Sequence, residues 1–424
     1  MKDSVEVNNL LNKARALLCV SVDPWLQPQG GQGTFARHIL SALKTDVAVV
    51  SPCTHSLAVG QWVARDFEGT QIAFFNLGML SREGATKRPL IPDRLSVLYM
   101  AARRMGAVYR SGIRNIFIDD PELLIPASRY EWKSACYNVA GALNPAAVSR
   151  YPAARLLARI CEGAILRSVR KLKPVVIFVA GDRNLVAGLR SFEMLSPYRI
   201  EALPTRVDLD RFYAEPKPEA RERLGLARDA LMLVTVGRLC WIKGWDLLLR
   251  VVEVLKVQNP GIVLLFVGDG EDRKAITAEV KARGLTENIR ITGFVSPETV
   301  RTFLSAGDVY VVGSYSEGWS VAMLEALACG KPIVSMRVSG SNDMIIDGLN
   351  GFVVDERNPD VYAAALRCAL ALPDAGQVSR NIAARYSVSG LRSELRKQWP
   401  ALQDVTPIRL DASPAVRTEN GRTA

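Results

Sequence analysis

Two glutamates flank the start of a helix that the sequence predicts after an apolar strand. Glu317 and Glu325 lie within residues 313–332, behind the apolar run 309–312 and ahead of a helix-stopping glycine. Ser320 is a typical N-cap, so the N–H groups after it would point out of the turn, where a phosphate can bind. A carboxylate can accept two hydrogen bonds from a ribose diol or stabilise charge developing on a sugar ring. The pattern favours a sugar-phosphate site, with the alternative that Glu317 is a loop residue and Glu325 a solvated helix position.

Two cations lie in an earlier unit of strand, loop and helix. Arg238 and Lys243 stand between the apolar run 231–236 and the amphipathic run 245–255. Fixed cations at the start of a helix can neutralise a departing diphosphate, a task that Mg²⁺ performs elsewhere. We therefore expect phosphate binding at this loop without a metal, with surface charge as the alternative for an isolated pair of this kind.

These blocks resemble the nucleotide-sugar signature of glycosyltransferase family 4, whose members are retaining enzymes with the GT-B fold. Glu317-Gly-Trp319 is followed by Glu325-Ala-x-Ala-x-Gly-x-Pro332. Further blocks match in order at Val236-Gly-Arg-Leu239 with Lys243-Gly244, Val267-Gly-Asp-Gly270, Ile291-Thr-Gly-Phe294 and Asp347-Gly-Leu-Asn-Gly351.

The resemblance implies a role for each matched residue. The donor diphosphate would be held by Arg238, Lys243 and the helix start, the ribose by Glu325, and the transferred sugar by Glu317. Catalysis would rest on Glu317, Arg238 and Lys243, which touch the reacting sugar and its leaving group. The further donor-binding residues that the resemblance implies are Gly30, Gly31, Gly268, Thr292, Gly293, Phe294, Gly318, Trp319, Ser320, Val321 and Ala322.

The first half of the chain departs from the family where the acceptor would react. Many relatives have a histidine after the strand that corresponds to 115–118, whereas this chain has Asp119 and Asp120 there. His55 follows another apolar run, 46–50. We take His55, Asp119 and Asp120 as acceptor-side candidates. The departure leaves two alternatives to a transferase open: a nucleotide-sugar epimerase of the GT-B fold, or a catalytically inactive regulator that binds the donor.

The pattern along the whole chain is that of parallel α/β structure. Apolar runs of strand length alternate with amphipathic stretches, and 424 residues suit two domains. With the resemblance, we expect the GT-B fold: two Rossmann-like doubly wound parallel-sheet domains facing across a cleft, with a C-terminal crossing helix. The expected parts are an acceptor-side domain at 1–204, a nucleotide-sugar-binding domain at 205–378, the crossing helix at 379–401 and a disordered tail at 402–424. One long basic helix is expected at 147–172.

The composition indicates a globular protein whose charge is unevenly distributed. Of all residues 49% are hydrophobic and 23% charged, no apolar run reaches the length of a membrane span, and the start lacks signal-peptide features. We therefore expect a cytoplasmic location. The net charge of +11 lies in the first half, where residues 1–200 hold 26 Lys and Arg against 15 Asp and Glu. This asymmetry favours contact with the anionic inner face of the cell membrane, with solubility as the alternative.

Other partners and cofactors are not indicated. No basic helix interleaved with aromatic residues suggests nucleic-acid binding, and the seven cysteines form no Cys-x-x-Cys pair, so we expect neither zinc nor disulfides. The sequence thus predicts a retaining transferase that needs no metal and no cofactor. It would move a hexose from a nucleotide-diphospho-sugar, with UDP first and GDP next, to a hydroxyl of a glycan or lipid-linked acceptor in envelope or exopolysaccharide synthesis.

Overall fold

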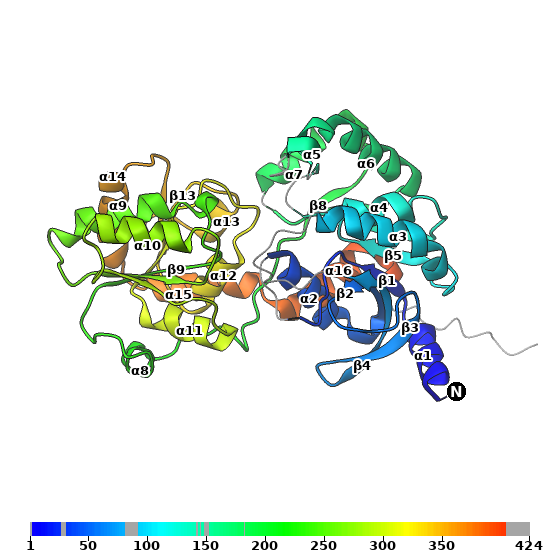
Figure 1. The fold of residues 1–424 in the computed structure, drawn as a ribbon, viewed down its shortest axis with the longest axis horizontal. Helices are drawn as coiled ribbons and strands as arrows, with labels where there is room; N and C mark the ends of the chain where they lie inside the picture. Colours follow the sequence, from blue (N-terminus) through cyan, green and yellow to red (C-terminus); the bar gives the residue numbers. More distant parts are fainter. Residues whose placement is uncertain are drawn as a thin grey trace, which may run out of the picture.

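The chain forms two domains that lie side by side, each built on one sheet with helices packed against it (Figure 1). This is a computed structural model, and it describes residues 2–26, 31–80, 92–140, 143–144, 146–147, 152–181 and 183–403. None of the helices in these ranges is long and apolar enough to cross a membrane.

The first domain holds eight strands and seven α-helices among the described residues. The strands are β1 (Ala16–Cys19), β2 (Val47–Cys53), β3 (Trp62–Phe67), β4 (Thr70–Met79), β5 (Asn115–Ile118), β6 (Ser134–Val139), β7 (Val176–Val179) and β8 (Ile200–Ala202). The helices are α1 (Lys2–Lys13), α2 (Gly31–Leu43), α3 (Asp93–Tyr109), α4 (Pro121–Ala127), α5 (Pro152–Leu156), α6 (Ala158–Leu172) and α7 (Arg183–Arg190).

The sheet of this domain has the order β3-β4-β2-β1-β5-β6-β7-β8. All neighbours pair in parallel except β3 and β4, which form an antiparallel hairpin at one edge. The expected parallel-sheet domain is confirmed, with this hairpin added at its edge. The single helix expected at 147–172 is wrong, because the helix breaks at Leu157 between α5 and α6, and the N-terminal end of that range lies largely outside the described residues.

The second domain holds six strands, all parallel. They are β9 (Met232–Val236), β10 (Val263–Val267), β11 (Ile289–Ile291), β12 (Val309–Val312), β13 (Ile333–Met336) and β14 (Gly351–Val354). The helices are α8 (Lys217–Arg223), α9 (Trp245–Lys256), α10 (Arg273–Ala282), α11 (Pro297–Ala306), α12 (Val321–Ala328), α13 (Ser341–Met344), α14 (Pro359–Leu370), α15 (Ala375–Arg385) and α16 (Leu391–Gln398). The sheet order is β11-β10-β9-β12-β13-β14, the doubly wound order of Rossmann domains.

Burial on both faces explains why the strands read as continuous apolar runs. Successive side chains of a strand point to opposite faces of the sheet. In β9, Met232 and Val234 pack into one core and Leu233 into the other. Because helices cover both faces, most positions of such a strand hold apolar residues.

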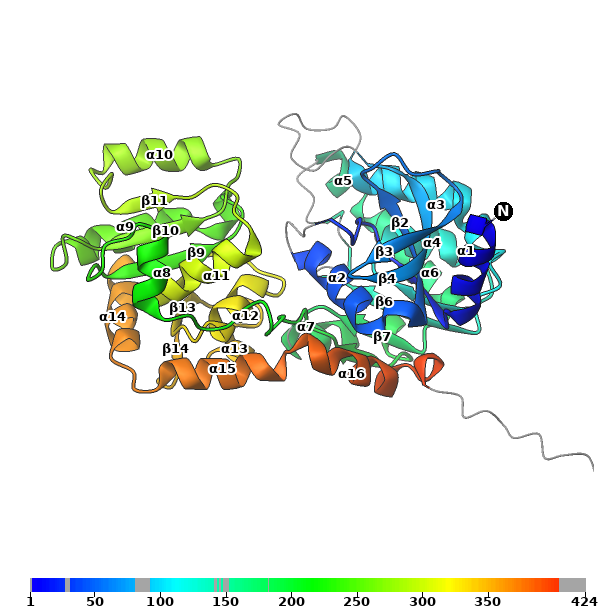
Figure 2. The ribbon, with the colours of Figure 1, turned by 90° about the horizontal axis from the view of Figure 1, so that it is seen from below.

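Two consecutive helices connect the domains on one side (Figure 2). On α15, Ile382 and Ala383 belong to a core of the second domain, whereas Leu395 on α16 and the following Trp399 are fully buried in a core of the first. The Trp399 indole N–H also donates to Ser134 Oγ at 2.8 Å. The C-terminal segment therefore crosses back to the first domain. The crossing segment consists of two helices instead of one, and the tail beyond residue 403 lies outside the described residues.

The chain passes between the domains a second time at residues 204–208, and the two crossings are paired. Val207 N donates to Tyr386 O at 2.8 Å, and Val388 N donates to Val207 O at 3.0 Å. We call residues 204–208 and 386–390 the hinge. A two-stranded connection of this kind restricts the relative motion of the domains more than one strand would.

Candidate functional site

A pocket lies at the centre of the second sheet, where the connections leave in opposite directions. β9 leads to β10 on one side and β12 leads to β13 on the other, so the loops after β9 and β12 diverge. Ligands of doubly wound sheets bind at this point, outside the carboxyl ends of the strands. The pocket is lined by Thr235, Val236, Gly237, Arg238, Leu239, Lys243, Trp245, Phe266, Tyr310, Val312, Ser314, Glu317 and Ser320.

Glycines bring the loops around this pocket into backbone contact. A Cβ on Gly244 would lie 1.8 Å from Gly313 O, and a Cβ on Gly268 would lie 2.1 Å from Gly237 O. Both Gly244 (φ 61°) and Gly268 (φ 144°) also have backbone angles that other residues rarely adopt. Only glycine fits these two positions, which explains why the matched sequence blocks contain it.

Lys243 and Glu317 form an ion pair across the pocket. Lys243 Nζ lies 2.7 Å from Glu317 Oε1 and 3.0 Å from Glu317 Oε2. Ser314 Oγ donates a further hydrogen bond to Glu317 Oε1 at 2.7 Å. The Lys243 side chain is 35% exposed and that of Glu317 is 11% exposed, so the ammonium remains open to solvent on the pocket side. These two predicted catalytic residues lie together, and Ser314, which the sequence analysis did not single out, orients one of them.

Arg238, the third predicted catalytic residue, lies at the pocket wall in a more open position. Its side chain is 61% exposed, and its guanidinium lies 3.7 Å from Glu271 Oε2. An exposed ion pair at this distance contributes little to stability. The guanidinium can therefore exchange Glu271 for an anionic ligand at small energetic cost.

The start of α12 presents backbone donors beside Glu317. Ser320 is the N-cap, as predicted, and its Oγ accepts from Met323 N at 3.3 Å. The N–H groups of Val321 and Ala322 have no acceptor within the helix, and Gly318 is exposed in the preceding turn. Lys243, Arg238 and these N–H groups thus lie at one side of the sheet, where they can donate hydrogen bonds to an anionic ligand.

Two residues of the matched signature lie elsewhere. The Trp319 side chain is buried at the hinge, where its indole N–H donates to Thr205 O at 3.1 Å and its ring packs edge-on against Tyr386. Glu325, one turn inside α12, is not among the residues that line the pocket. Burial raises the pKa of the Glu325 carboxyl to about 8.

Thr292, Gly293 and Phe294, which the resemblance assigns to donor binding, follow β11 directly. Thr292 Oγ1 accepts from Gly268 N at 3.2 Å and donates to Gly293 O at 2.8 Å, which ties this turn to the loop after β10. Phe294 is 68% exposed. Thr292, Gly293 and Phe294 thus follow the strand next to β10, and Phe266 of β10 lies in the pocket wall.

The N-terminus of α2 faces the N-terminus of α12 at the junction of the domains (Figure 1). A Cβ on Gly31 would lie 3.9 Å from Val321 Cγ2. Gly31, one of the predicted donor-binding residues, therefore adjoins the start of α12 from the other domain. Gly30 lies outside the described residues.

Asp119 and Asp120 are buried, and their surroundings favour the protonated form of the carboxyl groups. Asn138 Nδ2 donates to Asp119 Oδ1 at 2.6 Å. Burial and the neighbouring Asp120 carboxyl raise the pKa of Asp119 well above its usual range. Burial, followed by the charge of Glu122, raises the pKa of Asp120 to about 7.

Asp120 connects to the loop that carries Gly31. Ser21 Oγ and Gln32 Nε2 both reach Asp120 Oδ2, at 2.5 and 2.6 Å. Gln32 is the residue after Gly31, so Asp120 supports the start of α2. Because both aspartates are almost fully buried, neither presents a carboxylate to an acceptor in this conformation.

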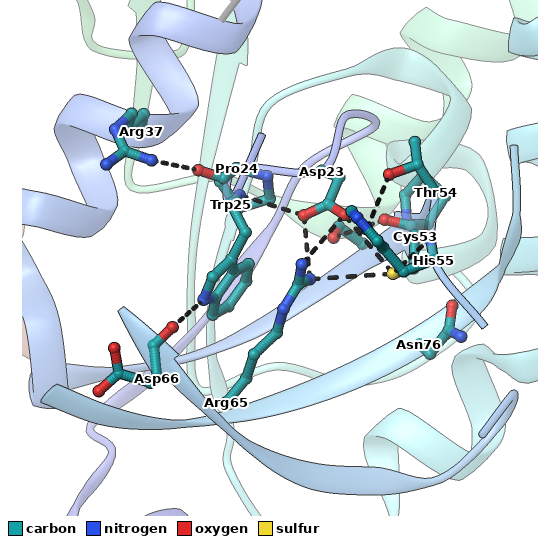
Figure 3. Close-up of polar contacts among 12 residues, drawn as sticks. Asp23, Pro24, Trp25, Arg37, Cys53, Thr54, His55, Arg65, Asp66 and Asn76 are labelled. Carbon is teal, nitrogen blue, oxygen red and sulfur yellow. Dashed lines mark hydrogen bonds and ion pairs between the residues drawn. The ribbon is translucent and has the colours of Figure 1, made fainter. Parts of the chain in front are cut away.

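His55, the remaining acceptor-side candidate, is exposed next to a buried polar cluster (Figure 3). Its ligand atoms and those of Asp23 and Cys53 lie within 4.8 Å of one another. However, Arg65 donates to both oxygens of Asp23, at 3.0 and 3.3 Å, and its Nη1 lies 3.9 Å from Cys53 Sγ. A metal ion would have to displace this guanidinium. The cluster is better explained as a structural contact in which Arg65 connects β3 to Asp23 in the loop after β1. The Arg65 guanidinium also stacks on the Trp25 ring of this loop, at 4.2 Å.

Together, these features define a two-domain protein of the GT-B fold, with a pocket at the carboxyl ends of the strands in its second domain. The structure of sucrose-phosphate synthase from Thermosynechococcus elongatus is similar over 90% of this chain and 97% of that protein, with a TM-score of 0.73 and 19% identity. The catalytic domain of starch synthase IV from Arabidopsis thaliana, bound to ADP and acarbose, has a TM-score of 0.64 and 14% identity over 91% of this chain and 99% of that domain. Such low identities establish the fold only.

Residues 216–385, which run from just before α8 to the end of α15, match the family described as "Glycosyl transferases group 1". This confirms the family that the sequence blocks predicted. A D-inositol 3-phosphate glycosyltransferase from Geodermatophilus obscurus is 35% identical over 41% of each chain. A GDP-mannose-dependent alpha-(1-6)-phosphatidylinositol monomannoside mannosyltransferase from Mycolicibacterium smegmatis is 33% identical over 41% of this chain and 48% of that protein. The chain spans about half the length, or less, of these curated relatives.

Proposed function

We propose that this protein is a retaining, metal-independent glycosyltransferase that moves a hexose from a nucleotide-diphospho-sugar to an acceptor hydroxyl. The observation that supports this most directly is the Lys243–Glu317 ion pair beside the N-terminus of α12. It places a fixed cation, a carboxylate and unpaired backbone donors in one pocket at the switch point of the sheet.

In this proposal the positive groups of the pocket bind the donor diphosphate. Lys243 and Arg238 would contact its oxygens, and the N–H groups at the start of α12 would add hydrogen bonds. As the bond between the anomeric carbon and the diphosphate oxygen breaks, negative charge grows on the leaving oxygen and positive charge on the sugar. The cations stabilise the first charge and Glu317 the second.

The acceptor hydroxyl would attack the anomeric carbon from the face that the diphosphate leaves. Its oxygen forms the new glycosidic bond while its proton passes to an oxygen of the departing phosphate. This assigns the base to the substrate, which agrees with the burial of Asp119 and Asp120. Retention of configuration then follows from attack on that face and needs no covalent intermediate.

Names of similar proteins guide the choice of substrates. Relatives are named for GDP-mannose, inositol phosphate and phosphatidylinositol, and a similar fold, Anabaena HepE, was solved with UDP and with UDP-glucose. We propose UDP as the first donor nucleotide to test and GDP as the second. The proposed acceptor is a glycan or a lipid-linked molecule of the cell envelope or an exopolysaccharide.

The first experiment is thermal unfolding of the protein in EDTA with UDP, GDP or ADP. A ligand at 100 times its Kd adds about 2.7 kcal/mol to the free energy of unfolding. Stabilisation by one nucleotide would identify the donor class and show that binding needs no metal. If no nucleotide stabilises the protein, the donor-site proposal fails.

A second measurement separates a transferase from the two alternatives. A transferase releases nucleotide in proportion to acceptor glycosylation. An epimerase would convert the nucleotide sugar without an acceptor, and an inactive regulator would bind the nucleotide and release no product.

A further inference from the structure

Three large aliphatic side chains are exposed to solvent where α5 meets α6. Leu156 is 85% exposed, Ile160 66% and Leu157 49%. No other five-residue stretch in the described ranges exposes three large hydrophobic side chains. A local group of this kind marks a surface that another molecule covers.

The same segment is strongly basic. Arg155 precedes the three aliphatic residues, and Arg159 lies between Leu157 and Ile160; both arginines are exposed, and no ion pair within the described part of the chain neutralises them. From residue 154 to 175 the single acidic residue is Glu162. The exposed basic residues of this segment are Arg155, Arg159, Arg167, Arg170, Lys171 and Lys173.

The exposed aliphatic residues are not needed to hold α6 in place. Ile165, Leu166 and Val169 pack α6 into the core of the first domain. Leu156 and Ile160 lie before this anchored part of the helix. Their exposure is thus a property of the surface, and their replacement should leave the domain folded.

We propose that Leu156, Leu157 and Ile160, with Arg155 and Arg159, dock this protein on an anionic lipid bilayer. The aliphatic side chains would enter the headgroup region and the arginines would contact lipid phosphates. Apolar and basic side chains of interfacial helices bind membranes in the same way. A second copy of the chain fits this surface poorly, because two such basic segments would repel each other.

The docking surface lies where it would serve the proposed reaction. α5 is on the side of the first domain nearer the second domain (Figure 1), and the donor pocket is in that second domain. The inference rests on the proposed function in this respect, since a lipid-linked acceptor would be met at the bilayer. Binding to vesicles is measured without substrates, so it can fail independently of transfer.

The test is flotation of the full chain with vesicles of phosphatidylcholine alone or mixed with phosphatidylglycerol. The wild type should float with the anionic vesicles only, and less in high salt. The variant Leu156→Glu/Ile160→Glu should lose binding by about tenfold or more, and so should Arg155→Glu/Arg159→Glu. The matched control is Val257→Glu, since Val257 is 82% exposed in the second domain; it should float like the wild type.

Three outcomes would overturn the inference. The wild type could fail to float with anionic vesicles, or both double variants could float like Val257→Glu. Alternatively, the wild type could be a dimer in light scattering that Leu156→Glu/Ile160→Glu dissociates, without binding of either protein to vesicles. Thermal unfolding with and without nucleotide, measured on every variant, confirms folding and tests the donor site separately.

Discussion

Lys243 Nζ and Glu317 Oε1 lie 2.7 Å apart although the two residues are on different loops of the second domain. The cation proposed for the diphosphate is therefore paired with the carboxylate proposed for the sugar. The pair fixes both side chains in the pocket. A donor would bind by sharing this pair, with its phosphate near the ammonium and its sugar near the carboxylate.

Loss of Lys243 should affect catalysis far more than folding. Because its side chain is 35% exposed, the ion pair adds at most about 1 kcal/mol to stability. Loss of one hydrogen-bond-donating group that stabilises developing negative charge lowers kcat by about 10²- to 10³-fold. Lys243→Ala should therefore lose transfer to this extent, in a steady-state assay, and keep nearly the wild-type melting temperature.

Arg283→Ala is the matched control for this prediction. The Arg283 side chain is 34% exposed and pairs with Glu253 and Glu279, at 3.0 and 2.9 Å, and Arg283 is not among the residues that line the pocket. This variant should retain activity. Full activity of Lys243→Ala, or equal losses in both variants, would contradict the role assigned to the lysine.

Glu325 should make nucleotide binding depend on pH. Burial raises its pKa to about 8, and only the ionised carboxylate can accept hydrogen bonds from both ribose hydroxyls with its two oxygens, as proposed for this residue. Affinity for the cognate nucleotide should then increase as pH rises from 6.5 to 8.5. Calorimetric titration of wild type and Glu325→Gln across this range isolates the residue from the titration of the nucleotide phosphate. Parallel curves for both proteins would show that Glu325 does not bind the ribose.

The sequence predicted the second domain more completely than the first, for a physical reason. β9, β10 and β12 are buried on both faces and read as continuous apolar runs. β3 and β6 were missed because polar residues interrupt them. Arg65 on β3 binds Asp23 at the edge of the sheet, and Asn138 on β6 binds Asp119.

For the candidate site, the spacing of motifs predicted which residues come together but not the direction in which each side chain points. Motif spacing was enough to find Lys243 and Glu317, because each follows a predicted strand. It did not show that the Trp319 indole turns toward Thr205 at the hinge, since a side chain's direction depends on packing with residues far along the chain. Ser314 carries no motif signal beyond a small polar residue after a strand.

Asp119 should make the protein less stable as pH rises. Burial and the neighbouring Asp120 carboxyl raise the pKa of Asp119 in the folded protein well above its usual range, so the native state keeps a proton that the unfolded chain releases. The free energy of unfolding therefore falls as pH increases above about 4. Asp119→Asn, which needs no proton, should melt at a higher temperature than the wild type at pH 8 and show a flatter pH profile.

Asp355→Asn is the control for this pH effect. The Asp355 carboxylate is exposed, and its hydrogen bond from Arg337 lowers its pKa. Replacement of Asp355 should leave the pH dependence of the melting temperature above pH 6 unchanged. An Asp119→Asn profile as steep as that of the wild type would show that Asp119 is ionised in the folded protein.

Close contact between the backbones at Gly244 and Gly313 should make Gly244 irreplaceable. A comparison with Gly225 separates the effect of this contact from the effect of backbone strain. The two residues have nearly the same φ, 61° and 59°. A Cβ on Gly244 would lie 1.8 Å from Gly313 O, whereas a Cβ on Gly225 has nothing within 4 Å. Alanine in this conformation costs about 1–2 kcal/mol by itself, so Gly225→Ala should lose that much in urea denaturation. Gly244→Ala should lose several kcal/mol, or displace the loop that carries Glu317 and so weaken transfer. Equal small losses with full activity would mean that the loops after β9 and β12 are not held together through this glycine.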